Sequence, residues 1–296
     1  MSKSTSIARA SFSAALVATL LTLPTALSSG QSDPVPPSAS AGETTDLALV
    51  ATRYQRRAYQ RAVLRDRPTA FLRNKRDQVT GQRGTITGST GVTRLPNGAR
   101  ARTFNGTGAY MSFANRSAFS VPTTGVITVE YWMRPSRLQF THEEGSGYVY
   151  VLGKGRPGGH EWYGRMYSRD NSENRPNRIS GYAFNPEGGL GAGSYFQDPV
   201  KRGRWIHVAL VINSNARSSA YPTGYTKIYK NGVLRDTDSL AGYNIRPEAS
   251  SAPLRIGTGY LGSYFAGAVG HVAFYNRELP ARRVAVHNRV MRRSLS

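Results

Sequence analysis

The feature that most constrains this chain is a long succession of short strand-like runs, separated by turn residues, that begins at Pro68. The runs are rich in aromatic and β-branched residues, and clusters of Gly, Pro, Asn and Ser separate them. No helical pattern alternates with the runs, so the strands lack crossover helices and are expected to pair antiparallel. The pattern predicts an all-β fold of two stacked antiparallel sheets. The predicted strands are Ala101–Phe104, Tyr110–Phe113, Val126–Met133, Tyr148–Leu152, Glu161–Tyr167, Arg178–Phe184, Trp205–Ile212, Tyr225–Tyr229, Val233–Arg235, Leu254–Ile256 and Phe265–Tyr275.

The N-terminal segment has the composition of an export signal. Residues 1–28 combine the basic residues Lys3 and Arg9, a short apolar stretch and a small-x-small site at Ala26–Ser28. We therefore expect a signal peptide over residues 1–28 and a secreted, extracellular mature protein without a transmembrane segment. Residues 29–45, rich in Ser, Pro, Gly and Thr, predict a disordered linker.

Two segments show helical spacing, one on each side of the strands. Residues 46–67 predict a basic helix whose apolar stripe is flanked by arginines. The stripe consists of Leu47, Val50, Tyr54, Ala58 and Ala62. Such a helix either touches a membrane or wall or packs its stripe on the next domain, and the two alanines favour packing. A second helix is predicted over Leu279–Met291, at the end of a sandwich domain that spans residues 68–296.

Charge and cysteine content limit the function classes. The chain has 39 Lys and Arg against 17 Asp and Glu, a formal net charge of +22. A field of this sign attracts polyanions such as anionic polysaccharides, lipid headgroups or nucleic acid, but arginine enrichment also follows from a GC-rich genome. No helix-turn-helix or RNA-binding motif is visible, so specific nucleic-acid binding is not expected. The absence of cysteine excludes disulfides, cysteine zinc sites and thiol nucleophiles.

Six short motifs follow one another along the chain. They are Tyr59–Arg73, Phe104–Tyr110, Val126–Pro135, Trp205–Ala209, Ile228–Gly232 and Phe265–Leu279. Their shared order across residues 59–291 resembles that of secreted bacterial laminin-G-like domains of the concanavalin A-like lectin/glucanase type. The resemblance implies a jelly-roll sandwich of two antiparallel sheets. It also implies carbohydrate or protein binding far more often than catalysis.

The resemblance further implies that the fold can hold a structural calcium ion. Here Asn105 stands where the family's Phe-Asp-Gly step has an aspartate, and Ala109 stands where an acid is common. Because Ca²⁺ takes oxygen ligands, carboxylates above all, these departures remove two ligands. The sequence therefore predicts no certain cofactor and leaves a structural calcium open.

The best candidate for a binding surface is the segment 160–198, which is dense in aromatic residues, Arg and Asn. Alternation puts Trp162 and Met166 on one face of a strand and Tyr163, Arg165 and Tyr167 on the other. With the first pair in the core, the second face offers rings that stack on sugars and donors for hydroxyl groups. The predicted ligand-binding residues are Tyr163, Arg165, Tyr167, Asn177, Tyr182 and Tyr195. Equally, such aromatic residues are ordinary for a sandwich. The glycine-rich residues 188–193 predict a mobile loop beside this face.

The function stays open between non-catalytic binding, catalysis on the same fold and retention on a cell wall by charge. The first interpretation is non-catalytic carbohydrate recognition, with a cell-surface or environmental glycan as partner. Hydrolysis on the same fold needs two carboxylates about 5–10 Å apart. Asp236 and Asp238 alternate on a strand, but we expect no aromatic platform beside them, and Glu143 and Glu144 would face opposite ways. A polysaccharide lyase with a Tyr or His base is also an alternative, as is a cell-wall or adhesion protein held by charge.

Some polar and aromatic residues in the strand motifs are expected to be structural. Trp132 and Trp205 are expected in the core, and His207 and His271 are expected to support the strands. No pair of histidines has metal-binding spacing, so the sequence assigns no metal ligand.

Overall fold

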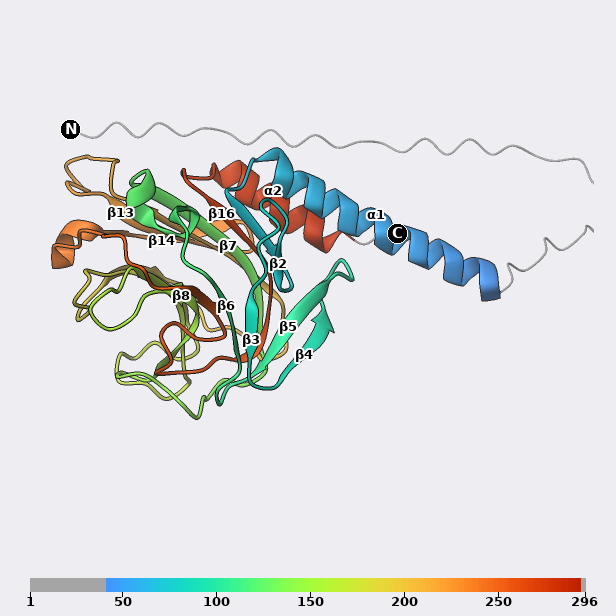
Figure 1. Cartoon of the computed structure of the whole chain (residues 1–296), viewed down its shortest axis with the longest axis horizontal. Helices are drawn as coiled ribbons and strands as arrows, with labels where there is room; N and C mark the ends of the chain where they lie inside the picture. Colours follow the sequence, from blue (N-terminus) through green and yellow to red (C-terminus); the bar gives the residue numbers. More distant parts are fainter. Residues whose placement is uncertain (1–40, 294–296) are drawn as a thin grey trace, which may run out of the picture. The chain divides into compact units, whose positions relative to one another are not determined.

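The computed structural model describes residues 41–293, with side chains from Leu49 onward. The predicted signal peptide over residues 1–28, and the predicted linker up to residue 40, lie outside these residues. The described residues form sixteen strands in two antiparallel sheets, with an α-helix at each end (Figure 1). The predicted all-β class and the antiparallel two-sheet sandwich are confirmed.

The two sheets differ in size and in what covers them. In the seven-stranded sheet the order is β11 (Ala192–Tyr195), β10 (Ile179–Ala183), β9 (Trp162–Tyr167), β8 (Tyr148–Lys154), β15 (Leu254–Ile256), β6 (Tyr110–Phe113) and β3 (Thr85–Thr87). In the nine-stranded sheet the order is β14 (Val233–Ser239), β13 (Tyr225–Lys230), β12 (Ile206–Asn213), β7 (Val126–Pro135), β16 (Ala266–Tyr275), β1 (Ala70–Arg73) and β2 (Arg76–Asp77). The hairpin of β4 (Thr90–Arg94) and β5 (Arg100–Asn105) joins this sheet through β16. Single-turn 3₁₀ helices lie at η1 (Ser117–Phe119), η2 (Val121–Thr123) and η3 (Leu240–Tyr243).

The main core lies between the sheets, and strand alternation fills it. On β9, Trp162 and Met166 point into this core, while Tyr163 belongs to a separate aromatic cluster on the outer face of the seven-stranded sheet. On β7, Val129 and Tyr131 face the core, while Trp132 packs under the helices. The predicted alternation on strand 162–167 is therefore confirmed, and it places an aromatic face on the outside of the smaller sheet.

Helices α1 (Ala41–Arg65) and α2 (Ala281–Arg292) lie side by side on the outer face of the nine-stranded sheet (Figure 1). Helix α1 begins at Ala41, five residues before the predicted start, and so includes the end of the predicted linker. The predicted apolar stripe is wrong at Val50 and Tyr54, which are 63% and 58% exposed, whereas Ala58 and Ala62 are half-buried. The side chain of Leu47 lies outside those that the structure describes, and the buried residues of the helix are Tyr59 and Val63. Tyr59 and Val63, in the C-terminal half of α1, pack on the sheet. No helix in residues 41–293 is long and apolar enough to cross a membrane.

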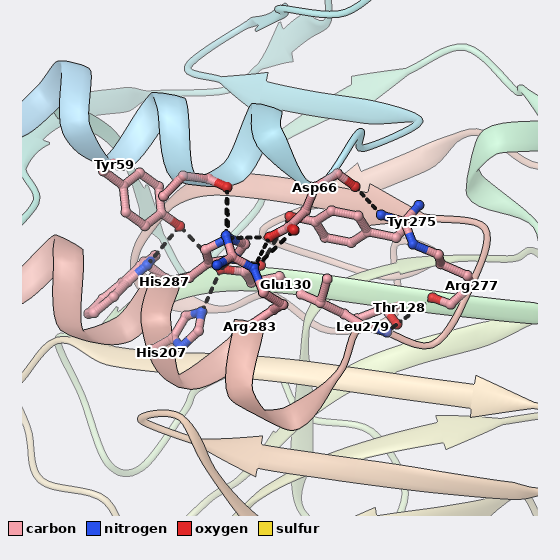
Figure 2. Close-up of polar contacts among 12 residues, drawn as sticks. Tyr59, Asp66, Thr128, Glu130, His207, Tyr275, Arg277, Leu279, Arg283 and His287 are labelled. Carbon is pink, nitrogen blue, oxygen red and sulfur yellow. Dashed lines mark hydrogen bonds and ion pairs between the residues drawn. The ribbon is translucent and has the colours of Figure 1, made fainter.

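A buried carboxylate fastens both helices to the sheet. Glu130, on β7, is fully buried, and its oxygens accept hydrogen bonds from four side chains (Figure 2). His207 Nε2 and His287 Nδ1 each lie 2.8 Å from a Glu130 oxygen, and the hydroxyls of Tyr59 and Tyr275 lie 3.3 Å away. Tyr59 comes from α1, His287 from α2 and the others from the sheet, so Glu130 joins three layers.

The ring of His287 is held as a cation between two carboxylates. Its Nδ1 faces Glu130, and its Nε2 lies 2.9 Å from Asp66 Oδ2 and 3.1 Å from the carbonyl oxygen of Ala62. Both nitrogens face acceptors, so both carry a proton. Burial opposes the charge on His287, but Glu130 and Asp66 raise its pKa. Burial likewise opposes the charge on Glu130, yet the two histidines hold its pKa well below the usual range.

Other differences from the sequence prediction concern short or polar segments. Strands β1 to β4 were not predicted, and part of the predicted mobile loop over residues 188–193 is the start of β11. Trp132 is buried as predicted, but Trp205 is only partly buried. Its indole packs beneath the Arg134 guanidinium, 5.0 Å from the ring centre, and donates to the carbonyl oxygen of Arg94. Trp205 thus covers the rim of the sheet.

Candidate carbohydrate-binding cleft

A cleft of about 490 Å³ opens on the outer face of the seven-stranded sheet, beside β9, β10 and β11. Strand β14 and the turn η3 form its other wall, so both sheets contribute to it. We call it the aromatic cleft. Its walls include the side chains of Tyr148, Arg165, Arg175, Tyr182, Tyr195 and Tyr243.

Arg165 is clamped between two tyrosine rings in the floor of the aromatic cleft. On the strand register Arg165 lies opposite Tyr150 on β8 and Ser180 on β10, which makes Tyr148 and Tyr182 its diagonal neighbours. The guanidinium carbon lies 3.6 Å from the ring centre of Tyr182 and 4.1 Å from that of Tyr148. These are close cation–π contacts, and they fix the plane of each group. Arg165 is only 5% exposed, so the two rings shield it from solvent.

Arg175 extends this stack towards the rim. Its Nη1 donates to the hydroxyl of Tyr182 at 2.7 Å, and its guanidinium carbon lies 4.1 Å from the ring centre of Tyr195. Glu173 pairs with Arg175 at 2.7 Å and accepts a hydrogen bond from Tyr167 at 2.9 Å. The cleft wall is therefore a ladder in which aromatic rings and guanidinium groups alternate.

The carboxylates of β14 secure the edge of β11. Asp236 accepts from the backbone N–H of Tyr195 at 3.0 Å, and Asp238 accepts from that of Gly193 at 3.2 Å. An edge strand leaves such N–H groups without a partner, so the two aspartates close the gap between the sheets. The second oxygen of each carboxylate accepts from the next backbone N–H along β14. Burial raises the pKa of Asp238 above its usual value.

Gly193 allows the ring of Tyr182 to lie flat on β11. A Cβ atom at this position would come within 2.4 Å of two ring carbons of Tyr182. Any side chain here would displace the ring from its position on β11. The close contact between the Tyr182 ring and β11 thus requires glycine at position 193.

The six predicted ligand-binding residues occupy different positions. Arg165, Tyr182 and Tyr195 line the aromatic cleft. Tyr163 and Tyr167 lie behind its surface, fully buried, where the Tyr163 hydroxyl is 2.8 Å from His160 Nδ1 and the Tyr167 hydroxyl bonds Arg175 and Glu173. Asn177 does not line the cleft: it forms a turn with φ 54° and bonds through its backbone.

Sequence reasoning missed several residues that line the cleft. Tyr148 was signalled by its alternation with Tyr150, but Tyr243 lies in a turn that carries no pattern. The expectation that Asp236 and Asp238 have no aromatic platform beside them was wrong, because they share the cleft with the tyrosine rings. The long connection that brings β14 beside β11 is not visible in the local sequence.

The turn at Asn105 does not fit the coordination that calcium requires. Asn105 Oδ1 accepts hydrogen bonds from the backbone N–H groups of Thr107 and Ala109, so it points back into the turn. Neither Asn105 nor Ala109 offers a carboxylate. Across residues 41–293, no three His, Asp or Glu side chains are arranged to hold a metal ion.

Two antiparallel sheets packed face to face, with a cleft on the outside of one sheet, define a lectin-like jelly roll. The chain belongs to the concanavalin A-like lectin/glucanase superfamily, whose family model matches residues 105–285. No curated protein matches the chain in sequence.

Solved structures share this fold at low sequence identity. Domain 4 of AbnA, an extracellular GH43 arabinanase from Geobacillus stearothermophilus solved with arabinotriose, is 16% identical, with a TM-score of 0.54 over 75% of this chain and 98% of that domain. The ligand-binding domain of botulinum neurotoxin serotype D, solved with N-acetylneuraminic acid, is 12% identical, with a TM-score of 0.57 over 77% of this chain. The receptor-binding domain of type G is also 12% identical, with a TM-score of 0.54 over 75%. The matches cover about half of each toxin domain, 52% and 51%.

Proposed function

We propose that this protein is a secreted, non-catalytic carbohydrate-binding protein and that the aromatic cleft holds the glycan. The observation that carries the proposal is the ladder of Arg165 and Arg175 with Tyr148, Tyr182 and Tyr195 in one open cleft. The partly exposed ring of Tyr195 and the exposed ring of Tyr243 offer apolar faces to a pyranose or furanose ring, and the Arg175 guanidinium at the rim offers donors to its hydroxyls. The two solved relatives with bound sugars, arabinotriose and N-acetylneuraminic acid, support the same class of ligand.

The cleft favours binding over two-carboxylate hydrolysis. Asp236 and Asp238 are the aspartates that line it, and each has both oxygens engaged by backbone N–H groups. A general acid or nucleophile needs a carboxylate oxygen directed at the substrate. The aspartates are better placed to hold the two sheets together than to attack a glycosidic bond. Secretion follows from the signal peptide proposed over residues 1–28, and retention on a cell wall is consistent with the net positive charge.

A glycan array followed by titration of two tyrosine variants tests this proposal. Tyr243 is 51% exposed in the aromatic cleft, and Tyr54 is 58% exposed on α1, so each is replaced by Ala with little effect on folding. Loss of one stacking ring should weaken binding of the best array ligand by about two- to tenfold in Tyr243→Ala. Tyr54→Ala should bind as the wild type does. Equal affinities for the two variants, or no ligand on a broad array, would contradict the assignment. Release of reducing ends or unsaturated uronate would show catalysis instead.

A further inference from the structure

A second cleft, of about 670 Å³, lies on the helix side of the sandwich and is lined by arginines. Its six arginines come from three segments that are separate in the sequence. Helix α1, the β1–β2 turn and the β4–β5 hairpin contribute two each, namely Arg53, Arg56, Arg73, Arg76, Arg94 and Arg100. We call it the arginine cleft. All six arginines lie before the region that the family model matches, whereas His271 of the same cleft lies inside it.

The hairpin tip packs directly on α1, which fixes the width of the cleft. A Cβ atom at Gly98 would lie 2.7 Å from Thr52 Cγ2 and 3.4 Å from Arg56 Nη2, so only glycine allows this approach. Its φ of 74° also favours glycine. Figure 1 shows the hairpin on the same side of the molecule as α1. The arginines of α1 and of the hairpin are thereby held facing one space.

No carboxylate balances these charges among the described residues. Among residues 49–293, whose side chains the structure describes, no Asp or Glu lines the cleft, and none of its six arginines forms an ion pair with a carboxylate. Burial lowers the pKa of Arg73, and the nearby charge of Arg56 lowers it further. Several cations converging without a counter-charge are costly unless an anion joins them.

Two buried N–H groups in the same walls also lack an acceptor among the side chains and backbone that the structure describes. His271 is 2% exposed, and its Nε2 accepts a hydrogen bond from Arg73 Nε at 3.3 Å. The neutral ring therefore carries its proton on Nδ1, which has no partner. Arg56 Nε is likewise buried without a partner. His271 holds φ 50°, an uncommon conformation for a residue with a side chain. The cleft thus supplies more donors than its own residues can satisfy.

We propose that the arginine cleft binds a ligand that carries two or more closely spaced tetrahedral oxyanions, phosphate or sulfate. Planar guanidinium groups match such oxyanions with paired hydrogen bonds, and several forks around one space suit several anionic groups. A neutral glycan has no group that would balance the charge. The site is therefore distinct in chemistry from the aromatic cleft, which has both cations and carboxylates in its walls.

Calorimetric titration of the full chain with two probes tests the proposal. Inorganic tripolyphosphate represents phosphate, a heparin-derived hexasaccharide represents sulfate, and the tighter binder identifies the source of the oxyanion. The test variant carries Arg53→Gln, Arg76→Gln and Arg100→Gln, all exposed residues of the arginine cleft. The control variant carries Arg217→Gln, Arg246→Gln and Arg282→Gln, exposed residues elsewhere with the same total change of charge.

The cleft variant should lose at least about tenfold in affinity for the preferred probe, because three charge-assisted contacts disappear. The control variant should lose less than about threefold, since its charges act only through the screened field. Tyr243→Ala should leave affinity for either probe unchanged, which separates this site from the proposed glycan site. Equal losses in both triple variants would show diffuse attraction and overturn the proposal. Absence of binding to both probes would overturn it as well. Circular dichroism of both variants verifies that the fold is retained.

Discussion

Replacing Glu130 by Gln should destabilise the protein strongly, because the change breaks the buried centre that joins both helices to the sheet. Gln keeps the size of the side chain and one acceptor oxygen, but its amide NH₂ replaces the other oxygen. In place of Oε1 that NH₂ would face the donors of His207 and Tyr59, and in place of Oε2 it would face those of His287 and Tyr275. The imidazolium of His287 would also lose one of its two anions, keeping only Asp66.

The magnitude follows from the cost of breaking a buried ion pair. Removing one partner of such a pair costs about 3–5 kcal/mol, because the remaining charge stays out of water. For a domain of this size that loss lowers the melting temperature by roughly 6–20 °C. Because helices α1 and α2 both lose a contact, we expect the whole domain to unfold together at the lower temperature or denaturant concentration.

Urea unfolding followed by tryptophan fluorescence measures this loss, since Trp132 donates to Tyr59 at 3.2 Å and reports on the centre directly. The matched control is Glu187→Gln, an exposed glutamate for which we expect a change within about 0.5 kcal/mol. A double-mutant cycle with His287→Gln should give a coupling of about 1–3 kcal/mol. If Glu130→Gln lowers the free energy of unfolding no more than Glu187→Gln does, the hydrogen bonds to Glu130 do not hold the helices on the sheet.

Two further predictions concern pH and the aromatic cleft. Burial and the charge of Arg73 lower the pKa of His271 to about 3, so stability should fall by up to about 1.4 kcal/mol per unit as pH drops below 6.5. Burial opposes the charge on His287, but Glu130 and Asp66 raise its pKa above 6.5. The stability that His287 contributes to the folded protein is therefore complete below pH 6.5 and is lost as pH rises through the folded-state pKa. The unfolding free energy should therefore peak near 6.5, and a steady rise between about pH 5 and 8 in urea titrations would refute this. Gly193→Ala should displace Tyr182 and weaken glycan binding, at a cost of about 1–3 kcal/mol in stability, whereas Gly242→Ala, which adds its Cβ in open space, should change neither.

Long strands with a clear period were predictable from the sequence, and short polar strands were not. Strand β7 was predicted because its β-branched and aromatic residues run over Val126–Met133, and β9 because its apolar residues alternate. Strand β4, with the sequence Thr-Gly-Val-Thr-Arg, has no buried residue and forms only because it pairs with β5. Strand β11 lies in a glycine-rich stretch and owes its place to β10 and to the aspartates of β14. Pairing partners, not local propensity, determine these strands.

The candidate site was predictable to the extent that it comes from one continuous segment. Arg165, Tyr182 and Tyr195 lie in the segment 160–198, whose composition identified it. Asp238 and Tyr243 come from a different sheet and a turn, and only the tertiary fold brings them to the same cleft. The burial of Tyr163 and Tyr167 depends on loops that fold over the outer face, which alternation cannot reveal.

The excess of arginine was explained equally well by genome composition and by function while only the sequence was considered. In the structure, carboxylates on the sandwich form ion pairs with single basic residues beside them, as Asp77 does with Arg116 and Glu278 with Lys227. The arginine cleft instead gathers six cations from three distant segments, and no carboxylate among the described side chains lines it. Composition bias raises the number of arginines but gives no reason for them to converge, and convergence costs repulsion. Binding to the cleft should therefore show a steep salt dependence between about 50 and 200 mM NaCl, and the cleft variant should flatten it more than the control does. If both variants give the same slope, genome composition is the better explanation of the charge.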